Sequence, residues 1–285
     1  MIKQQAILLA GGIILLVGLF FFAKTTGPST EPADSGPGMQ ASPGSASAPL
    51  TTESIIDAAK QHLSDAQHSA VIQLEQSVVR GDVKDQKIRI YRQLSDYWRD
   101  SLNEPEIGAY YAGESAKLEK SEKNLTFAAR LFLGKLMATE DAGMQNWLAT
   151  NAKSLYEEAL KLNPVNDSLK IELGTCYLFS TISATPMEGI LKIKEVADRD
   201  SSNMYAQLML GLGDIRSGQY DKAIERLTKV TAAEPQNLQA IFNLAETYER
   251  KADKANAIKW YTIAENMVTM PDAKKELQQR INSLK

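Results

Sequence analysis

Apolar residues recur at three- and four-residue spacing along most of the chain that follows Glu53, which is the pattern of amphipathic helices. The first such series predicts one long helix over residues 53–84, with apolar positions at Ile55, Ile56, Ala59, Leu63, Ala66, Ala70, Leu74 and Val78. No stretch alternates apolar and polar residues between hairpin turns, as exposed strands do. The pattern therefore predicts an all-α fold.

A different apolar pattern stands at the start of the chain. Residues 6–23 read AILLAGGIILLVGLFFFA and carry no charge. As a helix they would span about 27 Å, close to the roughly 30 Å hydrocarbon core of a bilayer. We predict a single transmembrane anchor in residues 1–24. A cleaved secretory signal is the alternative, but the bulky Phe20, Phe21 and Phe22 stand where its cleavage site needs small residues.

The charges beside this segment predict its orientation. Lys3 lies on one side, and on the other side Lys24 is followed by no further base until Lys60. This favours an N-terminus in the cytoplasm and a C-terminal domain on the trans side, periplasmic or extracytoplasmic. Residues 25–52 consist mostly of Pro, Gly, Ser, Thr and Ala, which predicts a disordered linker. Glycosylation of this Ser/Thr/Pro stretch is the alternative to a plain spacer.

Internal repetition predicts how the helices are arranged. When the chain is shifted by 34 residues, the segments after Asn203 and Asn237 align, with Leu210 on Leu244, Gly211 on Ala245, Ala223 on Ala257 and Ile224 on Ile258. The period, the small residues at fixed places and the proline after the second helix resemble the tetratricopeptide repeat family. That resemblance implies a right-handed superhelical solenoid of helix-turn-helix repeats.

The repeats are expected to fill residues 85–270 in about five units. The last two match the pattern well. The unit around Gly174 has about three extra residues, and the unit around Gly134 about six. The first unit is the most degenerate, with Ser95 at its small position. Residues 271–285 then predict a capping helix with Leu277, Ile281 and Leu284 facing inward, since a terminal repeat needs a polar outer face.

The resemblance further implies that the first helix of each pair lines a concave groove that binds a segment of another protein. By repeat register, the partner-binding positions are Ile171, Leu178, Phe179, Tyr205, Leu208, Leu212, Ile215, Phe242, Glu246 and Arg250. The groove is expected to be apolar in its middle and charged at its ends, where the first repeat offers Arg89, Arg92, Asp96, Arg99 and Asp100. Of the carboxylate-clamp positions used by some family members, only Asn243 matches. The alternative is a groove filled by the chain's own long helix, from Glu53 to Arg80, or by the capping helix.

Composition and motifs point away from catalysis. The net charge of −3 is unlike that of a nucleic-acid-binding domain. Cys176 is the only cysteine, and His62 and His68 lie on different faces of a helix, so neither a metal site nor a cofactor is expected. No phosphate-binding, zinc-protease, nucleophile-elbow or dinucleotide motif is present.

These observations together predict a non-catalytic, membrane-tethered scaffold or adaptor, of the assembly-factor or chaperone-like kind. Its partner would be a protein or peptide held in the concave groove. The alternative is a self-associating membrane organiser, a possible homo-oligomer, whose groove is filled by its own long helix.

Overall fold

The computed structural model describes residues 50–80, 83–182 and 187–285. The predicted anchor in residues 1–24 and nearly all of the predicted linker lie outside these described residues. Within the described ranges, no helix combines the length and apolar character needed to cross a bilayer.

The described residues form α-helices and one short π-helix, with no strand among them. The all-α prediction is therefore confirmed for this part of the chain. The helices are α2 (Thr52–Lys60), α3 (Asp65–Arg80), α4 (Lys84–Asp96), the π-helix η1 (Tyr97–Ser101), α5 (Pro105–Glu119), α6 (Glu122–Ala138), α7 (Ala142–Leu162), α8 (Asp167–Leu178), α9 (Met187–Arg199), α10 (Met204–Arg216), α11 (Tyr220–Ala233), α12 (Leu238–Arg250), α13 (Lys254–Met267) and α14 (Pro271–Leu284).

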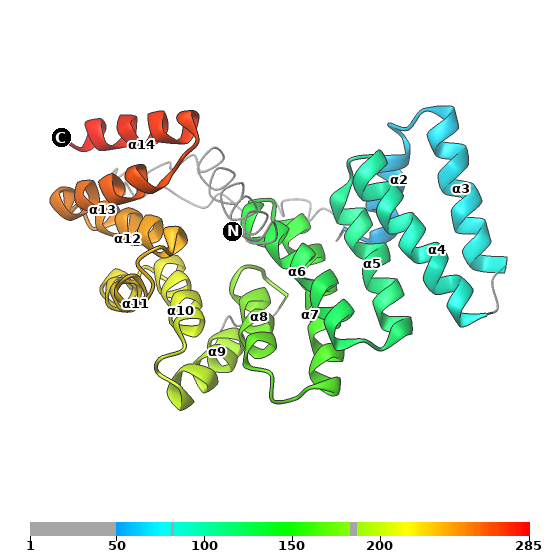
Figure 1. The fold of residues 1–285 in the computed structure, drawn as a ribbon, viewed down its shortest axis with the longest axis horizontal. Coiled ribbons are helices and arrows are strands. Elements are labelled where there is room, and N and C mark those ends of the chain that lie inside the picture. The colour runs from blue at the N-terminus through cyan, green and yellow to red at the C-terminus, as the bar shows by residue number, and fades with distance from the viewer. Residues whose placement is uncertain (1–49, 81–82, 183–186) are drawn as a thin grey trace, which may run out of the picture.

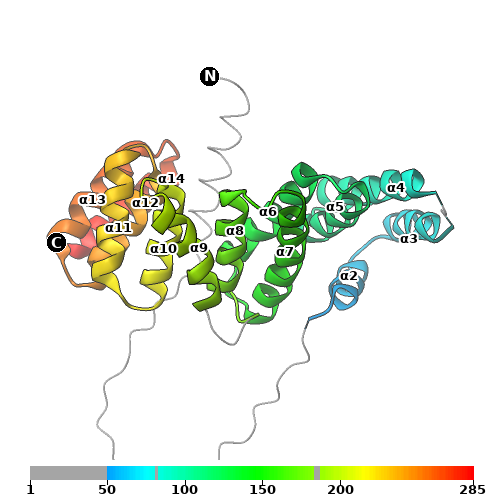
Figure 2. The ribbon, with the colours of Figure 1, turned by 90° about the horizontal axis from the view of Figure 1, so that it is seen from below.

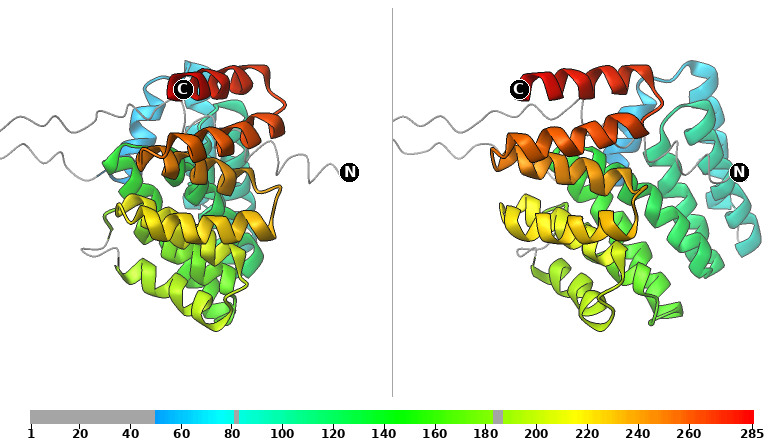
Figure 3. Two further views of the ribbon diagram at one scale, coloured as in Figure 1. Left: turned by 90° about the vertical axis from the view of Figure 1, so that its left-hand side faces the viewer. Right: turned by 60° about the vertical axis from the view of Figure 1, so that its left-hand side comes forward.

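Successive helices pair and stack into a solenoid. Figure 1 shows the pairs following an arc, with α6, α8 and α10 along its inner side and α7, α9 and α11 along its outer side. Each helix packs mainly on its neighbours in sequence. The last helices, yellow to red in Figure 3, lie one above another, and α14 closes the row by burying Leu277 and Ile281.

An asparagine starts three of the inner helices. Asn166, Asn203 and Asn237 are the N-caps of α8, α10 and α12, and each side chain accepts a hydrogen bond from the backbone N–H three residues later. Such caps satisfy one of the free N–H groups of the first turn. They also fix the repeat register, because the eighth residue after each cap is Gly174, Gly211 or Ala245, and all three are buried.

Small residues sit where paired helices cross. A Cβ added to Gly174 on α8 would lie 2.7 Å from the carbonyl oxygen of Gly189 on α9, so the two backbones nearly touch. Ala223 and Ala257 take the same role in the next pairs and are fully buried. The small positions that the sequence pattern singled out are therefore the close-approach points of the fold.

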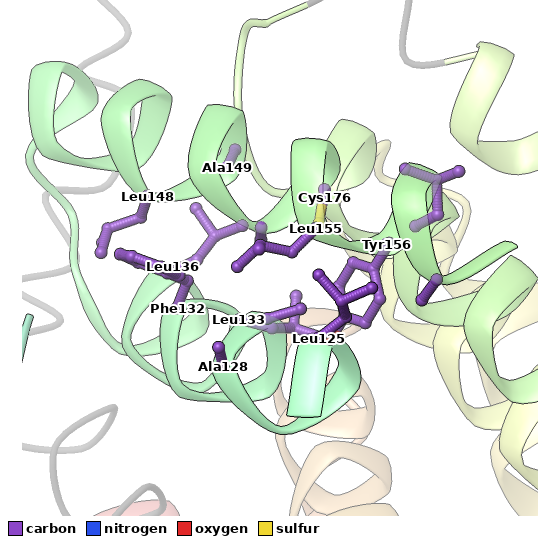
Figure 4. Packing of buried hydrophobic residues seen from close by; sticks show 14 of the residues in the cluster. Leu125, Ala128, Phe132, Leu133, Leu136, Leu148, Ala149, Leu155, Tyr156 and Cys176 are labelled. Atoms are coloured by element: carbon purple, nitrogen blue, oxygen red, sulfur yellow. The ribbon is translucent and has the colours of Figure 1, made fainter. Parts of the chain in front are cut away.

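The core is continuous across the middle of the solenoid. Figure 4 shows α6 and α7 facing each other through Leu125, Phe132 and Leu136 on one helix and Leu148 and Leu155 on the other, with Cys176 of α8 beside them. The rings of Phe132 and Trp147 meet edge to face, with centroids 5.6 Å apart.

The prediction of one long helix over residues 53–84 is wrong. The chain forms α2 and α3, separated at residues 61–64, where the Ser64 backbone and side chain both bond Gln67. The break lets α3 turn back, so that Val71 is buried with Leu94 and Trp98 in one cluster. Lys60 and the Tyr111 hydroxyl both donate to Glu75, at 2.7 Å and 3.0 Å, which ties α2 and α3 to α5.

The chain enters the solenoid beside α7. The Nε1–H of Trp147 donates to the Thr52 hydroxyl at 3.0 Å, and Leu50 packs near Gly143. The entry point therefore lies against the start of α7, although α3 and α4 stand at one end of the row in Figure 2.

Candidate functional site

A hollow of about 270 Å³ lies between the inner helices in the C-terminal half of the arc. It is lined from α6, α7, α10, α12 and α14, from the connection between α6 and α7, and from Phe179, which directly follows α8. The residues come from the C-terminal half of α10 and from most of α12, so several repeats contribute to one surface. We call this surface the inner hollow.

Six of the ten predicted groove residues line the inner hollow. They are Phe179, Leu212, Ile215, Phe242, Glu246 and Arg250. Ile171, Leu178 and Leu208 do not line it, because they are buried among the neighbouring helices. Tyr205 is half-buried outside it, and burial raises the pKa of its hydroxyl with help from the nearby Glu172 charge. The partner-binding role of all ten residues stays a prediction.

The expectation of an open apolar middle is corrected by the burial of these side chains. Leu212 is 6% exposed and Ile215 is 8% exposed, so both form a floor rather than an open surface. Inner helices approach closely here, since Leu178 would contact a Cβ placed on Gly213 at 3.4 Å. Only Phe179 and Phe242 among the predicted apolar residues are both half-exposed and in the hollow.

The floor is covered by adjacent inner helices and not by the N-terminal helices. No residue of α2 or α3 lines the inner hollow, and Figure 2 places α3 at the far end of the row from α10 to α14. The alternative in which residues 53–84 fill the groove is therefore wrong for the described part of this chain.

Three arginines stand around the hollow, and their partners differ. Arg250 pairs with Glu246 at 2.6 Å within α12, and Nε of Arg280 donates to Glu249 at 2.9 Å. Arg216 instead places its guanidinium over the ring of Phe179, 5.0 Å from the ring centroid. No carboxylate of the described ranges lies within ion-pair distance of Arg216 in the structure.

Burial acts on Arg216 as well. It lowers the pKa of the guanidinium, because the charged form loses hydration beside the Phe179 ring. A cation–π contact of this kind stabilises the folded protein by about 0.5–1 kcal/mol at an exposed site, and by more at a desolvated one. The arginine is thus a partly desolvated charge at the wall of the hollow.

Several lining residues were not predicted from the sequence. Thr139 and Glu140 form the wall from the connection of α6 and α7, Gln145 comes from the first turn of α7, and Arg280 comes from the capping helix. The signal was present in the six extra residues of that repeat, which lengthen α6 and carry its end into the hollow. The sequence pattern puts Gly134 at the small position of this repeat, but Gly134 is half-buried. The eighth residue after the Ser121 N-cap is instead the fully buried Ala129.

A second hollow lies at the N-terminal half, among residues predicted for the charged end of the groove. Arg92, Asp96 and Arg99 line it, together with the exposed ring of Phe127. Arg92 pairs with Glu119 at 2.9 Å and Arg99 with Asp96 at 2.7 Å. Because its charges are paired with each other, this hollow presents little unbalanced charge to a ligand.

The described residues do not gather metal ligands. No group of three His, Cys, Asp or Glu side chains in the described ranges could hold a metal ion. Cys176 is buried, and burial raises the pKa of its thiol, so the reactive thiolate is disfavoured. His62 is exposed in the turn that follows α2, and His68 is exposed on α3.

Comparison with known proteins supports the repeat family. A family model described as the tetratricopeptide repeat matches residues 197–266, from the end of α9 to α13. No curated protein matches the chain. The family match and the all-helical fold together support a tetratricopeptide repeat solenoid in this protein.

Solved structures resemble the fold at low identity. TTC0263, a tetratricopeptide repeat protein of Thermus thermophilus, is 17% identical with a TM-score of 0.51, over 69% of this chain and 98% of that chain. PilW, a type IV pilus biogenesis factor, is 16% identical with a TM-score of 0.47, over 69% and 92%. YrrB, a tetratricopeptide repeat protein with an unusual peptide-binding site, is 17% identical with a TM-score of 0.41, over 72% and 97%. At these identities the similarity concerns the fold alone.

Proposed function

We propose that the protein is a non-catalytic scaffold that holds a segment of a partner protein in the inner hollow. The observation that carries this proposal is the gathering of side chains from α6, α7, α10, α12, α14 and the end of α8 around one surface. A segment laid there would contact several repeats at once, and half-exposed Phe179 and Phe242 would offer it aromatic area.

The second half of the proposal is tethering to a membrane. Its support is the uncharged run of residues 6–23 followed by the Pro/Gly/Ser/Thr-rich residues 25–52. The solenoid would then work on the trans side of that membrane. Full-length protein should remain in the membrane pellet after carbonate extraction and keep its original N-terminus. A soluble mature form that begins near Lys24 would contradict the anchor.

Photo-crosslinking in cells tests partner binding directly. A photoreactive amino acid is placed at Glu140 or Gln239 in the inner hollow of the full-length chain, or at the exposed Thr228 on the outer helix α11 as a control. We expect both hollow positions, and not Thr228, to yield the same partner protein by mass spectrometry. Equal yields at all three positions would contradict a specific site. Crosslinks between copies of this chain would favour the self-associating organiser.

A further inference from the structure

The charges around the inner hollow are unevenly compensated. Arg250 and Arg280 are each held by a glutamate of α12, whereas Arg216 has only the face of Phe179 beside it among the described residues. Glu140 lines the same hollow, and both Glu140 and Arg216 are exposed. The hollow therefore contains one cation, exposed and stacked on Phe179, that no carboxylate of the described residues neutralises.

A carboxylate is the group that this arrangement recognises best. A guanidinium stacked on a ring keeps the edge of its fork free, and that edge can accept a carboxylate through two parallel hydrogen bonds. Burial lowers the pKa of Arg216 because its charged form loses some hydration. A bound anion would stabilise that charged form and offset the loss.

Apolar surface adjoins this cation. Phe179 lies under the guanidinium, and Phe242 lines the same hollow from α12. Leu212 and Ile215 close the floor between them. A ligand side chain that sits beside the carboxylate would therefore meet aromatic and aliphatic surface.

We propose that the occupant of the inner hollow is an internal segment of a partner protein that presents an Asp or Glu side chain to Arg216 and a neighbouring large apolar side chain to Phe179 and Phe242. This inference rests on the proposed function and names the chemistry of its ligand. A side-chain carboxylate is favoured over a chain terminus, because Asn243 alone matches the carboxylate-clamp positions, and one of the two N–H groups of its amide already donates to the carbonyl of Gln239 at 2.8 Å.

The test starts from a library of random 12-residue peptides displayed internally between flexible flanks, selected on the full-length protein. We expect the selected peptides to share an acidic residue within three positions of a large apolar residue. Substitution of that acid by Gln in a synthetic peptide should weaken binding at least about tenfold. Peptides without an acidic preference would overturn this inference and leave the scaffold proposal standing.

A charge exchange makes the test specific. Arg216→Glu should weaken the acidic peptide at least about tenfold, and a Lys-containing version of the same peptide should bind this variant better than it binds the original protein. The control is Lys222→Glu on the outer helix α11, an exposed residue whose ammonium donates to Gln219, and it should leave both affinities unchanged.

Three further outcomes would contradict the inference or the scaffold proposal. Equal binding of the acidic peptide to the original protein and to Arg216→Glu would overturn the inference. A gain in affinity only for peptides with a free C-terminus would place a chain terminus in the hollow and overturn it as well. Failure to select any peptide that competes with crosslinking at Gln239 would count against the scaffold proposal itself.

Discussion

Gly218 and Ala252, one repeat apart, share the same left-handed backbone conformation, with φ of 72° and 60°. Their surroundings match too. The N–H of Gly218 donates to Ile215 and that of Ala252 to Glu249, while the next N–H in each turn reaches back to Asp214 or Tyr248. The same turn thus ends α10 and α12, but only the first has the residue that adopts this conformation without strain.

Ala252→Gly should therefore stabilise the protein. Removing the backbone strain of an alanine in the left-handed conformation stabilises the folded state by about 1–2 kcal/mol. The greater freedom of glycine in the unfolded chain offsets part of this, which leaves a net gain of about 0.5–1 kcal/mol. Gly218→Ala should cost about 1 kcal/mol by the same reasoning. Thermal unfolding of the two variants checks this, and a lower midpoint for Ala252→Gly would contradict it.

Gly189→Ala should be strongly destabilising for its size. A Cβ there would meet the carbonyl oxygen of Gly174 and lie 2.8 Å from the Cβ of Tyr177, so the helices α8 and α9 would have to separate. Overpacking of this kind costs about 1–3 kcal/mol. Gly113→Ala is the matched control, because its new Cβ meets only the end of Leu155 at 3.2 Å and gains helix propensity. Urea unfolding should rank the two variants in that order, and equal midpoints would refute the crossing argument.

Leu212→Glu on the floor of the inner hollow should cost far more stability than Arg216→Glu on its wall. Leu212 is packed in the central cluster, so a charge there has no partner and should cost about 3–5 kcal/mol. Arg216→Glu, one turn later on the exposed side, should lower stability by no more than about 1 kcal/mol, the loss of its cation–π contact. Circular-dichroism melting distinguishes them. A Leu212→Glu variant that melts like the original protein would mean that this floor is open.

Glu172 predicts a pH dependence. It is 4% exposed, and Arg130 donates twice to its Oε1 but not to Oε2, which has no hydrogen-bond partner in the described structure. Burial therefore raises the pKa of this carboxyl above its ordinary 4.5, against the opposing effect of Arg130. A raised folded pKa gives stability that is present below 4.5 and lost as pH rises through the folded value.

The measurement is a comparison with Glu172→Gln, which cannot titrate. Its melting temperature relative to the original protein should increase as pH is raised from about 4 to about 8. The control Glu158→Gln, half-buried on α7 and without an ion pair among the described residues, should show no such trend. A difference that is constant with pH would contradict the raised pKa.

Glu75 should hold the N-terminal helices in place. Its carboxylate accepts from Lys60 and from the buried Tyr111, so Glu75→Ala leaves a buried hydroxyl without its partner and should cost about 1–3 kcal/mol. Hydrogen exchange should quicken in α2 and α3 while α8 to α13 keep their protection. Glu53→Ala, exposed on α2, is the control and should change neither region. Uniform loss of protection would show that the whole solenoid unfolds as one unit.

The periodic features of the fold were predictable and the irregular ones were not. Gly211, Ala223 and Ala257 could be placed from sequence because each repeat forces the same close crossing on the same position. The break between α2 and α3 could not, since the apolar spacing continues through residues 61–64 and the turn depends on local bonds of Ser64 and Gln67.

The candidate site shows the same division. Register identified Phe179, Phe242 and Arg250, because inner-helix positions follow the repeat. It could not show that Ile171 and Leu208 are buried, because that depends on how tightly neighbouring inner helices approach. It also missed Arg216 and Arg280, whose place depends on the curvature of the arc and on where the capping helix lies.

The entry of the chain beside α7 has a mechanical consequence. Thr52 is bonded to Trp147, so a pull along the residues that precede Leu50 reaches the start of α7 in the middle of the row. Gln145, on the wall of the inner hollow, lies within one turn of the loaded Trp147. If the protein is tethered through residues 25–52 as proposed, tension in this linker would therefore be delivered next to the surface where a partner would be held.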